Sequence, residues 1–129
     1  MHGIGQANNM SELIKTWLSA QCIDPESNEY ADVSWAVDEL FDLAHDDPDK
    51  LLANVIEILK IDSSPEILGA IGAGVLEDLL VYHGKDYIDT IIKLSKSDAN
   101  FKASLHFTYI DKGDVPTDVY EKFQENKLE

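Results

Sequence analysis

Apolar residues recur at intervals of three and four positions along most of this chain, a spacing typical of amphipathic α-helices. Helix-start signals accompany it: Asp47-Pro48 and Ser64-Pro65 each place a proline at a first helical position, and Asp98 is a cap residue for another start. No segment of the sequence shows convincing strand alternation, apart from a weak ambiguity at residues 105–110. The sequence therefore predicts an all-α fold of seven or eight short antiparallel helices. The expected helices cover residues 11–22, 29–45, 48–59, 65–72, 75–83, 85–97, 99–109 and 117–123.

The repeated helix starts suggest stacked helix pairs similar to HEAT-type repeats, although no clear internal sequence repeat accompanies them. A chain of 129 residues fits a single domain. We expect residues 11–123 to form that domain, with Ser11 capping its first helix. Residues 1–10 are expected to be a disordered leader or a remnant of cloning, and residues 124–129 a polar tail that frays.

Three features bear on the cellular compartment. Residues 1–10 have neither a basic start nor an apolar stretch, so they do not resemble a secretory signal. No uninterrupted apolar run approaches the roughly 18 residues of a membrane span. The single cysteine, Cys22, cannot form an internal disulfide, and we expect it to be a buried thiol near the end of the first apolar stripe. Together these features predict a cytoplasmic protein.

Charge restricts the class of partner more than any motif does. The chain has 25 acidic residues against 10 lysines and no arginine, and residues 24–49 hold ten acids and no base. Such a field repels phosphate backbones and anionic lipid surfaces, and the missing arginine removes the planar group that grips phosphates. We therefore expect no binding to nucleic acid or to membranes. The acidity favours a basic protein or a cation as partner, or it serves solubility alone.

Trp35 lies on the polar side of the second expected helix. On a helical wheel it is about 160° from Val37, the middle of the apolar stripe. Either this helix is sandwiched and the indole reaches a second layer, or an exposed indole among carboxylates forms a hot spot for a basic protein. The apolar stripe consists of Tyr30, Val33, Val37, Leu40, Phe41 and Ala44, and the neighbours of Trp35 are Asp32, Asp38, Glu39, Asp42 and Asp46.

The stretch LGAIGAGVLEDLL in the middle of the chain combines three glycines with a carboxylate pair. The spacing of Gly69, Gly72 and Gly74 matches neither a Walker loop nor a dinucleotide-binding loop. Because glycine disfavours a helix interior, we expect one helix to end near Gly72 and a new one to begin after Gly74. Glu77 and Asp78 would then lie in a first turn, where carboxylates interact favourably with free N–H groups. Adjacent helix residues diverge by about 100°, so these two are poor candidates for a catalytic pair.

The same stretch resembles the core of a family of small bacterial domains of unknown function. Residues 73–80 read A-G-V-L-E-D-L-L and are followed by Tyr82-His83-Gly84 and Tyr87-Ile88-Asp89, where the family core reads A-G-P-L-E-D-L-L, then H-G, then an aromatic residue and I-[DE]. Val75 replaces the proline of the family. Trp35-Ala36, Glu39-Leu40 and the Asp47-Pro48 helix start also resemble the first half of the family. The resemblance covers residues 30–107 and implies an all-helical fold without an established activity.

The histidines do not form a recognisable metal or catalytic motif. His45 precedes Asp46, Asp47 and Asp49, but this segment lacks the paired histidines of a zinc helix and the central glycine of an EF-hand. His83 is accounted for by a helix C-terminus and the glycine that follows it. No serine, cysteine or histidine set matches a nucleophile motif. We therefore expect no metal site, no cofactor and no enzymatic activity.

These observations favour a non-enzymatic protein-binding module. Its acidic surface would engage a basic protein, as an immunity protein does when it neutralises a cationic toxin or nuclease. One alternative is a small enzyme or ligand-binding domain with a pocket near residues 72–80, lined by Glu77 or Asp78. Another is a self-associating scaffold subunit whose contacts lie at the neutral ends. The expected partner-binding residues are Trp35, Asp32, Asp38, Glu39, Asp42 and Asp46.

Overall fold

The computed structural model describes residues 2–128 of the chain, and the side chains of residues 11–127. It is 79% helical, and the described residues contain no strand. Six helices are present when the continuous run Pro65–Ser97 is counted as one, so the all-α prediction is confirmed and the expected number of helices was slightly too high. The elements are α1 (His2–Ala20), η1 (Asn28–Asp32), α2 (Ser34–Asp46), α3 (Pro48–Ile61), α4 (Pro65–Ala70), η2 (Ile71–Leu76), α5 (Glu77–Ser97), α6 (Ala99–Leu105) and α7 (Thr117–Leu128).

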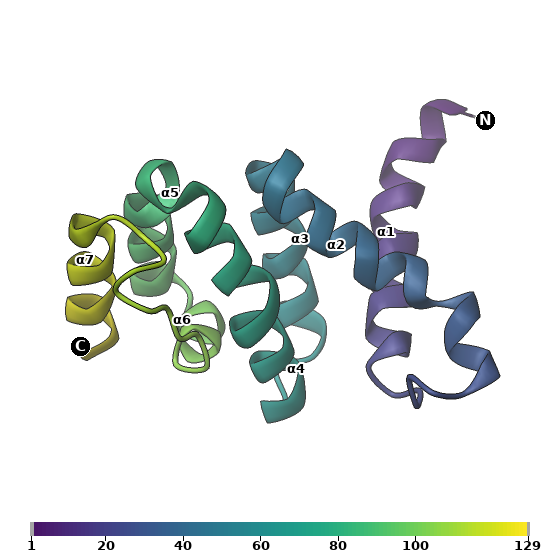
Figure 1. The fold of residues 1–129 in the computed structure, drawn as a ribbon. Helices are drawn as coiled ribbons and strands as arrows, with labels where there is room; N and C mark the ends of the chain where they lie inside the picture. Colours follow the sequence, from purple (N-terminus) through teal and green to yellow (C-terminus); the bar gives the residue numbers. More distant parts are fainter. Residues whose placement is uncertain (1, 129) are drawn as a thin grey trace.

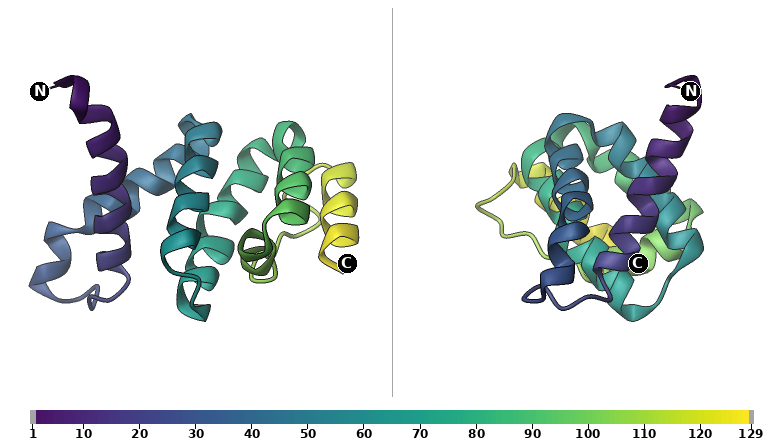
Figure 2. Two further views of the ribbon diagram at one scale, coloured as in Figure 1. Left: turned by 180° about the vertical axis from the view of Figure 1, so that it is seen from behind. Right: turned by 90° about the vertical axis from the view of Figure 1, so that its right-hand side faces the viewer.

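The helices follow one another along the long axis of an elongated molecule (Figure 1). α1 and α2 lie toward one end and α6 and α7 toward the other, with α3 and the α4–α5 run between them, and Figure 2 shows the same order from behind. α2 contacts α1, α3 and α5, whereas α7 packs on α5. α2, which carries part of the acidic segment of residues 24–49, therefore lies toward the α1 end, whereas α3, in which that segment ends, contacts α6.

Three helices begin where the sequence predicts. The Asp47 carboxylate accepts a hydrogen bond from the Lys50 backbone N–H at 3.2 Å, with Pro48 at the first position of α3. The Asp98 carboxylate caps α6 by accepting from the backbone N–H groups of residues 100 and 101, each at 3.0 Å. α4 begins at Pro65 as expected, but the Ser64 side chain makes no cap hydrogen bond. Each cap satisfies N–H groups that a helix leaves free at its first turn.

The second expected helix is two elements, and its buried face is rotated from the predicted stripe. Residues 28–32 form the separate 3₁₀ turn η1, and α2 begins only at Ser34. Val37 and Phe41 of the predicted stripe are half-buried at the edge of the core. Two alanines and two leucines make up the buried face, and α2 contacts three neighbouring helices. The buried residues of α2 are Ala36, Leu40, Leu43 and Ala44.

The predicted helix break at the glycines was wrong. Residues 71–76 form a π-helical turn that joins α4 to α5 without interruption. Gly72 is buried, and a Cβ at this position would lie 1.9 Å from the Ser104 carbonyl oxygen. The Thr108 hydroxyl donates a hydrogen bond to the Gly72 carbonyl at 2.7 Å. Gly72 is thus a point of close backbone contact with the end of α6, and the inserted residue of the π-turn accommodates it.

The predicted helix boundary at His83-Gly84 coincides with a kink that divides α5 into two helical segments, but the predicted C-terminal glycine cap was wrong. The chain kinks at His83, with φ −134° and ψ 22°, and then continues as helix to Ser97. Gly84 does not adopt the left-handed conformation of a C-terminal glycine. A Cβ on Gly84 would lie 3.0 Å from Cγ1 of Val119, so the glycine allows α7 to approach α5 closely.

The ends of the chain differ from the prediction in three further ways. α1 begins at His2, so Ser11 lies inside the helix and does not cap it. Cys22 is exposed just beyond α1, not buried. Residues 124–128 continue α7, which contradicts the frayed tail: Asn126 is buried and accepts from the Ser95 hydroxyl, and Lys127 donates to the Thr108 carbonyl at 2.7 Å. Burial lowers the pKa of Lys127. The division of residues 1–10 from the domain remains a prediction.

The Pro65–Ser97 run is long and apolar enough to cross a membrane by length and composition, with a mean hydropathy of 1.3 in its most apolar window. The count of uninterrupted apolar residues did not indicate this. In the fold the run is a core helix, because Ile71, Leu76, Leu80 and Ile91 are fully buried and α5 contacts α2, α6 and α7. A core helix satisfies the same criterion, so packing inside the domain accounts for its apolar character.

Candidate functional site

One side of α2 carries the expected partner-binding residues in helical register. We call Trp35, Asp38, Glu39, Asp42 and Asp46 the α2 acidic face. Their spacings of three, four, seven and eleven positions from the indole place them on one stripe of a regular helix. The stripe extends over about 16 Å at the rise of an α-helix.

All five side chains of this face are exposed, and Trp35 is 46% exposed. The indole therefore does not reach a second buried layer, one of the two interpretations that the sequence allowed. Its exposure follows from the register of α2, because the buried residues Ala36, Leu40 and Ala44 recur four positions apart and Trp35 lies outside their stripe.

The arrangement differs from the expected ring of acids in one respect. Trp35 lies in the first turn of α2, so the carboxylates extend from the indole in one direction along the helix. Asp32 lies in η1, exposed but outside the register of α2. The α2 acidic face therefore begins with Trp35 at the N-terminal end of the helix, and its four carboxylates follow toward the C-terminal end.

The α2 acidic face lies within residues 24–49, a segment that contains neither lysine nor arginine. Among the described residues, the lysine ion pairs Lys60–Glu57 and Lys122–Asp89 lie within α3 and between α5 and α7. The ten acids of residues 24–49 thus lie between the end of α1 and the first turn of α3, in a segment without lysine.

A second group of side chains joins the end of α2 to the kink of α5. His83 Nε2 is 2.7 Å from the His45 carbonyl oxygen, so this ring nitrogen carries a proton and donates it. The His45 ring contacts the Tyr82 ring in a tilted geometry, with centroids 3.8 Å apart, and its Nε2 lies 3.8 Å from an Asp78 oxygen. We call these four residues the α2–α5 junction. Sequence reasoning missed it, although the His83-Gly84 pair, where a helix boundary was expected and the chain kinks, was the signal that could have found it.

A tyrosine hydrogen bond extends this junction to α3. The Tyr87 hydroxyl donates to the Asp49 carboxylate at 2.9 Å. This bond raises the pKa of Tyr87 above its ordinary value, with smaller contributions from desolvation and the charges of Asp49, Asp47 and Asp86. The junction accounts for both histidines as structural contacts between helices.

Glu77 and Asp78 do not converge on one site. Glu77 accepts from the Tyr109 backbone N–H at 3.4 Å, whereas Asp78 faces His45 on α2. Both are half-buried, in the interior of the continuous Pro65–Ser97 run and not at a free helix start. The backbone of Gly72, which precedes them in the same helical run, packs directly against α6. No group of three or more metal-ligating side chains occurs among the residues that the structure describes.

The fold and these surfaces define an all-helical domain with an acidic, aromatic-ended helix face. The chain belongs to the Family of unknown function (DUF6869), whose sequence profile matches residues 24–127. The match extends from the segment before η1 through α7 and leaves α1 outside. No curated protein and no solved structure matches the chain. The expected membership of an uncharacterised family is confirmed.

Proposed function

We propose that this protein is a non-enzymatic binding module whose α2 acidic face engages a basic protein surface. The observation that carries the proposal is the exposed indole of Trp35 at the end of four exposed carboxylates in one helical register. Complementary fields would accelerate encounter, and burial of the indole would supply short-range affinity. Like-charged residues spaced four apart destabilise a helix, so a binding role explains why such a ladder persists.

The finer form of the proposal is an immunity-type inhibitor that covers a cationic toxin or nuclease in the bacterial cytoplasm. The A-G-V-L-E-D-L-L stretch supports the bacterial assignment through the resemblance described above. We also propose HEAT-like pairing of the helices, which the elongated row in Figure 1 supports because such rows present long exposed helix faces.

Affinity capture with purified variants tests the proposal. The wild-type chain should retain a protein of basic isoelectric point at low salt and release it at high salt. Trp35→Ala should weaken the reconstituted complex about 30-fold, the effect of removing a hot-spot residue. Neutralising Asp38, Glu39, Asp42 and Asp46 together should mainly slow association.

The matched control neutralises four exposed acids near the other end of the molecule: Asp111, Asp114, Asp118 and Glu121. This variant loses the same charge and should bind like the wild type to within a few-fold. Equal binding by the two quadruple variants, or binding indifferent to Trp35→Ala, would contradict a role for the α2 acidic face.

A further inference from the structure

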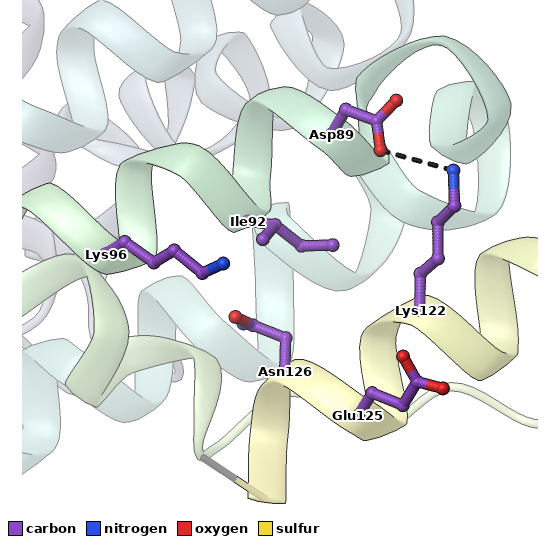
Figure 3. A pocket seen from close by; sticks show the side chains of 6 residues that line it. All are labelled: Asp89, Ile92, Lys96, Lys122, Glu125 and Asn126. Atoms are coloured by element: carbon purple, nitrogen blue, oxygen red, sulfur yellow. Dashed lines mark hydrogen bonds and ion pairs between the residues drawn. The ribbon is translucent and has the colours of Figure 1, made fainter.

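A pocket of about 240 Å³ lies between α5 and α7 (Figure 3), and no residue of the α2 acidic face lines it. Drug-sized sites have volumes of roughly 300–1,000 Å³, so this pocket suits a smaller ligand. Residues one and two turns apart on α5, and one turn apart on α7, line it. They are Asp89, Ile92 and Lys96 from α5, and Lys122, Glu125 and Asn126 from α7.

The polar groups of this pocket are segregated. Figure 3 shows the Lys96 ammonium near the Asn126 amide on one side, and the Asp89 and Glu125 carboxylates with Lys122 on the other. The Ile92 side chain lies between the two sides. Lys122 Nζ is 3.3 Å from an Asp89 oxygen, whereas Lys96 forms no ion pair with any side chain that the structure describes. The Lys96 ammonium is therefore the cation of this pocket available to an anionic group.

The Asn126 side chain is fixed on the Lys96 side of the pocket. It is only 8% exposed, and its Oδ1 accepts a hydrogen bond from the Ser95 hydroxyl at 3.2 Å. This contact orients the amide, so that Nδ2 is the atom that can donate toward a ligand beside Lys96. An ammonium and an oriented amide N–H are suitable donors for a carboxylate.

The charge of the pocket selects among anions, cations and zwitterions. Its lining has two ammonium and two carboxylate groups, whereas the whole chain carries a net charge of −15. The field of the chain opposes the approach of a simple anion but exerts little net force on a neutral zwitterion. We propose that the pocket binds a free α-amino acid: Lys96 and Asn126 hold its carboxylate, Asp89 and Glu125 hold its ammonium, and its side chain packs on Ile92. This inference is independent of the proposed function of α2.

NMR titration of the full chain with L-leucine tests the inference. The Asn126 side-chain amide and the backbone amides around residues 89–96 and 122–126 should shift in a saturable manner at millimolar leucine. The analogues 4-methylpentanoate, which lacks the ammonium, and 3-methylbutylamine, which lacks the carboxylate, should each bind at least about tenfold more weakly. An unperturbed Asn126 amide, or equal binding by either analogue, would overturn the proposal.

Charge-removing variants with matched controls locate the two ends of the ligand. Lys96→Met should weaken leucine binding about tenfold while leaving affinity for 3-methylbutylamine unchanged, and Glu125→Gln should show the reverse selectivity. Lys93→Met and Glu121→Gln change exposed residues of the same helices outside the pocket lining and should bind leucine like the wild type. If Lys96→Met and Lys93→Met bind leucine equally, the assignment of the carboxylate end is wrong.

Discussion

The α2 acidic face and the α5–α7 pocket are both polar surfaces on helices, yet they carry charge in opposite ways. α2 presents carboxylates alone, whereas α5 and α7 interleave both signs and pair Lys122 with Asp89 at 3.3 Å. The net charge of −15 therefore describes neither surface. The distribution of the lysines, more than the number of acids, therefore sets the charge of each surface.

The two regions also differ in what maintains them. On α5 and α7, opposite charges approach one another and the buried Asn126–Ser95 contact supports the arrangement. On α2 the carboxylates repel one another, and the helix persists because its other side is anchored in the core through Ala36, Leu40 and Ala44. The polar contacts between α5 and α7 therefore help to stabilise the fold, whereas the α2 acidic face depends on the packing of the other side of its helix.

Gly72 belongs to neither region and lies against the end of α6, and its substitution should have the largest effect. Gly72→Ala introduces a Cβ 1.9 Å from the Ser104 carbonyl oxygen, a backbone atom that moves only with α6. We expect the free energy of unfolding to fall by about 3 kcal/mol in urea denaturation, since overpacking of a core typically costs 1–3 kcal/mol and backbone contact is the severe case. A single cooperative transition in the variant would show that both ends still unfold together.

Gly69→Ala is the matched control in the same helical run. A Cβ there would meet the Phe107 ring at 3.5 Å, an ordinary contact. The helix preference of alanine should make this variant as stable as the wild type or more stable by up to about 1 kcal/mol. Similar losses at both positions would show that close contact with α6 is not the reason for Gly72.

Much of the fold follows from local signals in the sequence. Pro48, Pro65 and Asp98 mark helix starts because they satisfy or remove the free N–H groups of a first turn, and the structure agrees with all three. At Gly72 the predicted break is absent, and at Gly84 a kink stands in place of the predicted glycine cap, for one shared reason. Both glycines are required by close contact with another helix, and such tertiary contact is invisible to a rule that treats glycine as a helix breaker.

The candidate sites divide in the same way. The α2 acidic face could be predicted because its residues belong to one helix, whose period fixes their register. The separation of η1 from α2 could not be predicted in this way, and it moves Asp32 out of that register. The α5–α7 pocket was missed entirely, because Lys96 and Asn126 are 30 positions apart and meet only after α7 packs on α5.

Charge removal should affect the stability of the two regions with opposite sign. Neutralising Asp38, Glu39, Asp42 and Asp46 removes two like-charge pairs spaced four apart and one spaced three apart, so we expect a gain of about 0.5–1 kcal/mol. Replacing Lys122 and Asp89 by Met and Asn removes an exposed ion pair and should cost at most about 0.5 kcal/mol. Urea denaturation at low and high salt measures both; the α2 gain should shrink at high salt. A loss of stability in the α2 variant would contradict the inferred repulsion between these carboxylates.

Tyr87 links the acidic end to α5 and should give the smallest effect, one that depends on pH. Its neutral hydroxyl donates to Asp49 at 2.9 Å, which raises the pKa of Tyr87 above the ordinary value of about 10. A raised pKa in the folded state means that the contribution of Tyr87 to stability is fully present below pH 10 and is lost as the pH rises through the folded-state pKa. Tyr87→Phe should therefore be less stable than the wild type at pH 7–9, and the difference should vanish at higher pH, where the phenolate would face Asp49.

Urea denaturation across this range, with a tyrosine absorbance titration of both proteins, measures the effect of Tyr87→Phe. Tyr109→Phe, at a side chain 72% exposed, is the control and should match the wild type throughout. A stability difference independent of pH would show that the ring of Tyr87, and not its bond to Asp49, joins the two regions.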